Sequence, residues 1–143
     1  MTITEFLLAR IAEDETAALA AVDGQADPEN GWGYEGRTLI PHVGIIHHAV
    51  QAEHITRWHP YRVVAECAAK RAIVERYVDN LDLALSYRNP KWRDAMNDQD
   101  RIEHRMQEAR AATSLEACVA LAAIYADHPD YQTDWKLPTG GVA

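Results

Sequence analysis

Five of the seven histidines fall within one short stretch of the chain, at positions His42, His47, His48, His54 and His59. Neutral imidazole is a common metal ligand, but a metal site needs three or four ligands that converge on one point. His47 and His48 would point to opposite faces of a strand, and the five-residue step from His54 to His59 does not place both on one helix face. We therefore expect no metal ion, and the alternative is a site formed by His54, His59 and His128.

A second polar cluster lies in the stretch YADHPDYQTDW, residues 125–135. A carboxylate beside a histidine can perform acid and base chemistry. The same residues also fit a structural role, in which Asp127 caps a turn started by Pro129 while Tyr131 and Trp135 pack against the body of the protein. We favour the structural role and predict no catalytic residue. The candidate binding residues of this stretch are Asp127, His128, Asp130, Tyr131 and Trp135.

The stretch GWGYEG, residues 31–36, has the glycine spacing of a dinucleotide-binding fingerprint. Such a fingerprint binds pyrophosphate where it closes a turn between a buried strand and the N-terminus of a helix. Here it follows a polar run and leads into strand-like residues. We therefore expect a turn that needs glycine, and no cofactor.

Composition narrows the function classes. The chain has 143 residues, 48% of them hydrophobic, and a formal net charge of −8. Nucleic-acid binding is disfavoured because it needs a basic face, and no apolar run is long enough to span a membrane. Cys67 and Cys118 lie in apolar helical segments and are expected to be reduced core residues of a cytoplasmic protein. We expect a single domain over residues 1–143 with a loose tail at 137–143.

Hydrophobic periodicity predicts a mainly α-helical, single-domain bundle. Thr4 is the expected N-cap of the first helix, and Pro60 suits the first position of the second. The sequence TSLE, residues 113–116, has the pattern of a capping box and separates the last two predicted helices. The predicted helices span residues 4–22, 60–87, 90–112 and 114–126, with a short irregular β-hairpin near 32–48 between the first two.

The predicted helix 90–112 has a thin apolar seam formed by Trp92, Met96, Ile102 and Met106. A seam this narrow is typical of a helix that pairs with one neighbour, and tryptophan and methionine are enriched where proteins meet. We expect the seam to bind a second copy of the chain or a host protein. The alternative is an intramolecular hairpin with residues 60–87.

Two stretches resemble a family of small proteins found in actinobacteria and their bacteriophages and classed as a domain of unknown function. They are EHITRWHPYRVVAECAAKRAIVE, residues 53–75, and LAAIYADHPDYQTDW, residues 121–135. The shared pattern is a His-Ile pair, an Arg, a proline-started helix with Arg-Val and Ala-Lys-Arg, and the YADHPDY motif followed by Trp. His59 departs from it, because Asp commonly precedes the proline. The resemblance implies an accessory protein in a bacterial cytoplasm and no particular activity.

A non-enzymatic regulatory or protein-interaction protein is the expected function. The reasons are the thin seam of residues 90–112, the acidic N-terminal third and the lack of an assembled catalytic motif. The alternative is a metal-dependent or acid/base enzyme that uses the histidines or the YADHPDY stretch.

Overall fold

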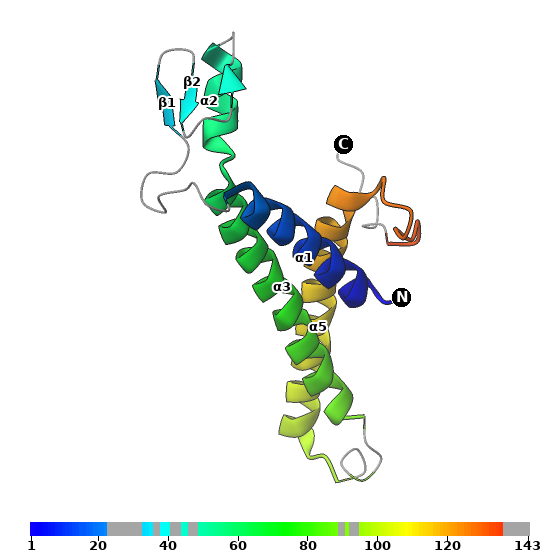
Figure 1. The fold of residues 1–143 in the computed structure, drawn as a ribbon. Helices are drawn as coiled ribbons and strands as arrows, with labels where there is room; N and C mark the ends of the chain where they lie inside the picture. The colour runs from blue at the N-terminus through cyan, green and yellow to red at the C-terminus, as the bar shows by residue number, and fades with distance from the viewer. Residues whose placement is uncertain are drawn as a thin grey trace, which may run out of the picture. The chain divides into compact units, whose positions relative to one another are not determined.

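Long α-helices dominate the structure, a computed structural model that describes residues 1–22, 33–35, 38–40, 44–45, 49–88, 91 and 95–135 (Figure 1). The prediction of a mainly helical protein is confirmed. None of the described helices combines the length and the apolar character needed to cross a bilayer. The helices are α1 (Ile3–Val22), α2 (Ala49–Arg57), α3 (Pro60–Ser86) and α5 (Asp98–Ala122), and a short 3-10 helix, η1 (Ala123–Tyr125), continues α5.

Two compact units make up the chain, and each is described by itself. The first unit contains residues 1–10 and 70–143, and the second contains residues 11–69. The single-domain organisation stays a prediction, and the tail 137–143 lies outside the described residues.

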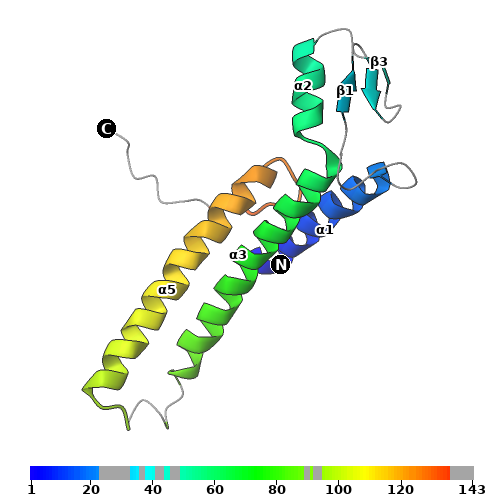
Figure 2. The same cartoon turned by 90° about the vertical axis from the view of Figure 1, so that its left-hand side faces the viewer.

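Three very short strands belong to the second unit. They are β1 (Gly33–Glu35), β2 (Thr38–Ile40) and β3 (Gly44–Ile45), paired antiparallel in the order β1-β2-β3. The prediction near residues 32–48 was a hairpin, which has two strands, whereas the described residues form three. Helix α2 follows and lies beside β1 (Figure 2). The prediction left out this nine-residue helix.

The glycine-rich stretch GWGYEG leads into this sheet. Gly33 opens β1 and pairs with Ile40 of β2, so the next described element is another strand. A pyrophosphate site would need a helix N-terminus at this point. The described part of the stretch therefore has the backbone of a strand.

Helix α1 begins with a capping box two residues before the predicted cap. Thr2 N donates to Glu5 Oε2 at 2.7 Å, and Glu5 N donates to Thr2 Oγ1 at 3.2 Å. Thr2 is therefore the cap, and the prediction of Thr4 was wrong. The hydrogen bonds from Thr2, above all from its backbone N–H, favour the carboxylate and lower the pKa of Glu5. The predicted apolar face is confirmed, since the following side chains are buried: Phe6, Leu7, Ile11 and Ala18.

Helix α5 is continuous over 25 residues. The predicted break between residues 112 and 114 was wrong. Thr113 Oγ1 donates to the carbonyl of Ala109 at 3.0 Å, and Ser114 Oγ donates to the carbonyl of Arg110 at 2.7 Å. These hydroxyls bond to the preceding turn of their own helix, so they leave the helix unbroken.

The N-terminus of α5 also differs from the prediction, which placed a helix start at residue 90. The side chain of Asn97 accepts a hydrogen bond from Asp100 N, and Asp100 Oδ2 accepts one from Asn97 N, at 2.9 and 3.0 Å. This capping box starts the helix at Asp98.

Within the first unit, α3 from Lys70 onward lies antiparallel to α5 (Figure 2). Lys70 contacts Tyr125, Asn80 contacts Ser114 and Arg88 contacts Glu108, so residue numbers fall along α5 as they rise along α3. The intramolecular hairpin that the sequence left open as an alternative is therefore present. Among the described residues of this unit, the buried apolar ones are Ile3, Phe6, Leu7, Val74, Ala84, Ala111, Cys118 and Ala122.

Candidate functional site

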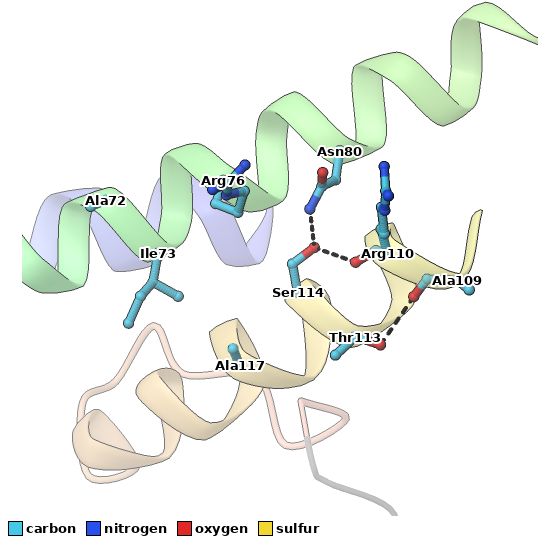
Figure 3. A pocket seen from close by; sticks show the side chains of 9 residues that line it. All are labelled: Ala72, Ile73, Arg76, Asn80, Ala109, Arg110, Thr113, Ser114 and Ala117. Carbon is cyan, nitrogen blue, oxygen red and sulfur yellow. Dashed lines mark hydrogen bonds between the residues drawn. The ribbon is translucent and has the colours of Figure 1, made fainter. Parts of the chain in front are cut away.

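A groove of about 770 Å³ runs between α3 and α5 (Figure 3). We call it the α3–α5 groove. Of the described residues that line it, none is acidic, and three are alanines. The lining residues are Ala72, Ile73, Arg76 and Asn80 of α3 and Ala109, Arg110, Thr113, Ser114 and Ala117 of α5.

Small side chains keep the groove open. Ala109, Thr113 and Ala117 follow one another at steps of four, so they lie on one face of α5. All three are exposed. A third helix can approach closely where two helices present such small residues, because few side-chain atoms separate the backbones.

The polar groups between the walls bond to each other. Asn80 Nδ2 donates to Ser114 Oγ at 3.1 Å, and Ser114 Oγ donates to the carbonyl of Arg110 (Figure 3). The first bond joins α3 to α5, and the second lies within α5. They make Asn80 and Ser114 structural residues of the groove.

The two arginines of the groove differ from its other polar residues. Arg76 projects from α3 and Arg110 from α5, and both are exposed. Within the part of the chain that the structure describes, neither guanidinium makes an ion pair or a side-chain hydrogen bond. The groove is therefore locally basic, although the whole chain carries a net charge of −8.

An exposed stripe of apolar and small residues continues along α5 on both sides of the groove. Its members recur at steps of four and three, which keeps them on one helix face. Ile102, Met106 and Ile124 are 46%, 45% and 59% exposed. We call this face the outer stripe, and it consists of Ile102, Met106, Ala109, Thr113, Ala117, Ala120 and Ile124.

The predicted seam is only partly found on α5. Ile102 and Met106 belong to the outer stripe, but Met96 precedes the helix and lines a separate cavity of about 500 Å³. Trp92 lies outside the described residues. The sequence-based prediction missed the C-terminal half of the stripe because alanines give no apolar contrast and TSLE resembled a helix start.

Phe6 is the centre of a ring cluster at the C-terminal segment. It is fully buried, and its ring centroid lies 6.1 Å from Tyr131 and 5.0 Å from Trp135. Tyr131 Oη donates to the carbonyl of Trp135 at 2.6 Å. The predicted packing of these two residues is confirmed.

The YADHPDY histidine is bound by a buried arginine. Arg10 Nη1 lies 2.7 Å from His128 Nδ1, also contacts His128 Nε2, and lies 3.7 Å from Asp130 Oδ2. The backbone N–H of Asp130 donates to the same Nδ1 at 3.1 Å. With donors directed at it, Nδ1 acts as an acceptor, so its lone pair is not available to a metal or a substrate proton. Asp127 is exposed, and among the described residues its side chain makes no hydrogen bond of the predicted capping kind.

His54 and His59, the other two histidines of the alternative metal site, lie in and next to helices of the second unit. His54 is an exposed residue of α2, and His59 Nδ1 accepts a hydrogen bond from Arg62 N at 3.3 Å, which caps α3. Among the residues that the structure describes, no three His, Cys, Asp or Glu side chains are placed to hold a metal ion. His54 and His59 belong to one compact unit and His128 to the other, so the alternative set stays a prediction. His42, His47 and His48 lie outside them.

Both cysteines are buried thiols, as predicted. Burial raises the pKa of Cys118, because the thiolate would lose its hydration. Burial also raises the pKa of Tyr77, with a smaller contribution from the nearby Cys118 thiolate. A raised pKa leaves little reactive thiolate, which makes Cys118 a poor nucleophile. Its role is that of a core residue.

Comparison with known proteins identifies the family but not an activity. Neither the curated proteins nor the solved structures include a match to the chain. A family model matches residues 1–137. The chain therefore belongs to the family described as a family of unknown function (DUF6221).

Proposed function

We propose that this protein is a small accessory protein of actinobacteria or their bacteriophages. In this proposal it acts in the bacterial cytoplasm and regulates or assists a host process by binding another protein, without catalysis. The actinobacterial or phage setting rests on the resemblance of residues 53–75 and 121–135. The binding role rests on the surface of α5.

The observation that carries the proposal is the outer stripe together with the α3–α5 groove. The stripe extends over 22 residue steps, which is about 33 Å along a helix. Its large members are exposed, while the core of the same unit is formed by other residues. An exposed apolar face of this length is typical of a surface that another protein covers.

The enzyme alternative has less support. Its best residue, His128, uses Nδ1 to accept hydrogen bonds that tie the C-terminal segment to α1. Asp130 lies beside the same arginine. These contacts give the YADHPDY stretch a structural role. We therefore do not include it in the proposed binding surface.

Site-specific photo-cross-linking in an actinobacterial cell tests the proposal. A benzophenone amino acid at Ala117 would lie in the groove, and the same group at Ala112 would lie about 140° away around α5. Both positions are exposed alanines of one helix, so Ala112 is a matched control. We expect a discrete cross-linked protein from position 117 and not from position 112. Equal cross-linking from both positions, or none from either, would contradict a binding role for this face.

A further inference from the structure

We propose that the α3–α5 groove binds an acidic helix, with one carboxylate for Arg76 and one for Arg110. This inference rests on the proposed function and specifies its partner. The partner helix carries a face of small residues, and its two carboxylates lie on opposite edges of that face about two turns apart.

Charge complementarity indicates the acidic character. Of the described residues that line the groove, the only charged ones are Arg76 and Arg110. Other arginines of this unit form ion pairs: Arg88, just after α3, with Glu108 at 3.3 Å, and Arg101 of α5 with Asp98 at 3.9 Å. Within the described residues, Arg76 and Arg110 make no ion pair or side-chain hydrogen bond. They border an apolar groove, where a partner that lacked carboxylates would bury positive charge without compensation.

The register of the two helices gives the spacing of the carboxylates. The Asn80–Ser114 hydrogen bond sets one level along the antiparallel pair. Arg76 precedes Asn80 by four residues and Arg110 precedes Ser114 by four, so the arginines lie in opposite directions from that bond (Figure 3). At 1.5 Å per residue each is about 6 Å away, and together they are about 12 Å apart along the helices. A partner helix covers that distance in about eight residues.

A helix suits the groove better than an extended peptide. The walls are helices whose backbone hydrogen bonds are made internally, so they offer no strand edge to an extended chain. Both walls contribute small residues, Ala72 from α3 and Ala109, Thr113 and Ala117 from α5 (Figure 3). Such small residues favour close contact with another helix of small residues.

A display library of helices on an alanine framework provides the probe. Each helix would be about 20 residues long, or about 30 Å, with Glu, Lys and Gln randomised along both edges of one apolar face. Selection on the full chain should enrich Glu on opposite edges about eight residues apart. The enriched peptides should bind the Arg76→Glu/Arg110→Glu variant at least about tenfold more weakly. Selection on that variant should enrich Lys at the same positions.

The matched control is Arg101→Glu/Arg105→Glu, which changes the net charge equally on residues of α5 outside the groove lining. It should leave binding of the enriched peptides unchanged. The selection could also enrich helices that show no preference for Glu but whose binding Ala117→Trp blocks. That result would overturn the acidic partner and leave the groove as a binding site. Failure to enrich any helix that Ala117→Trp blocks would overturn the proposed function as well. The protein could instead self-associate through the groove. If Ala117→Trp abolished that self-association and Arg76→Glu/Arg110→Glu left it intact, the groove would bind a second copy of the chain and the acidic helix would be rejected.

Discussion

The rings of Phe6 and Trp135 lie with their centroids 5.0 Å apart and their planes at 51°. Phe6 belongs to the second turn of α1, and Trp135 is the last residue that the structure describes. The contact therefore joins the N-terminal helix to the C-terminal segment of the same compact unit. Much of the stability of this segment should depend on it, because the segment has no long helix of its own.

Truncation of the ring cluster should destabilise the protein in proportion to burial. Phe6→Ala empties a fully buried site, so we expect a loss of about 4 kcal/mol in the free energy of unfolding. Trp135 is half-buried, and Trp135→Ala should cost about 2 kcal/mol. Denaturant unfolding measures both. The control is Ile124→Ala, which truncates a 59% exposed side chain nearby and should cost less than about 0.5 kcal/mol. An unchanged stability of Trp135→Ala would show that the ring does not pack as described.

The hydrogen bond between Asn80 and Ser114 should be measurable as a coupling energy. A double-mutant cycle with Asn80→Ala and Ser114→Ala should give about 1 kcal/mol, because the bond is part-buried and joins two helices. Thr113→Ala is the comparison, since Thr113 bonds only to its own helix. A coupling to Asn80 as large from Thr113 as from Ser114 would contradict the register of α3 and α5.

Stability should fall in alkaline solution. Burial raises the pKa of Cys118 above 9.0 and that of Tyr77 above 10.0, their ordinary values. Between the unfolded and the folded pKa the unfolded chain binds fewer protons, so the free energy of unfolding decreases as pH rises through this window. Below pH 9 this contribution is fully present. Denaturant titrations between pH 8 and pH 11 measure this loss. The Cys118→Ala/Tyr77→Phe variant should lose less stability over this range than the unaltered protein. An equally steep loss in the variant would show that Cys118 and Tyr77 are not the cause of the alkaline destabilisation.

Polar substitution of the outer stripe should separate binding from folding. Ile102 and Met106 are about half exposed, so Ile102→Gln/Met106→Gln should change the free energy of unfolding by less than about 0.5 kcal/mol. The same variant should weaken the cross-link formed from position 117, because the stripe and the groove share one face of α5. A marked drop in melting temperature would instead make these residues part of the core.

Metal analysis addresses the enzyme alternative. Protein purified without a histidine tag should contain no stoichiometric transition metal, because His59 and His128 already accept hydrogen bonds through Nδ1. Emission spectrometry after dialysis makes the measurement. One equivalent of zinc or iron that survives dialysis would support a metal-dependent activity and contradict our proposal.

The parts of the fold that the sequence predicts well are those with strong apolar contrast. Phe6, Leu7 and Ile11 recur at helical spacing among charged residues, and α1 follows the prediction closely. The error in α5 has a local cause. Thr113 and Ser114 can cap a new helix or bond to the preceding turn, and the choice depends on packing that the local sequence does not contain.

The groove was less predictable than the helices. Ala109 and Ala117 carry no pattern that marks a surface, and Arg76 and Arg110 lie far apart in the sequence. Their common position follows from the pairing of α3 with α5 through Asn80 and Ser114. That pairing is a tertiary contact, so only the structure places both arginines in one groove.

The unbroken course of α5 limits how this segment can change in length. Each residue added or removed turns the rest of a helix by about 100°. A single deletion between Met106 and Ala117 would therefore move one half of the outer stripe away from the other, even if every remaining residue kept its identity. We expect relatives of this protein to vary in residue type along α5 while they preserve the number of residues from Ile102 to Ile124.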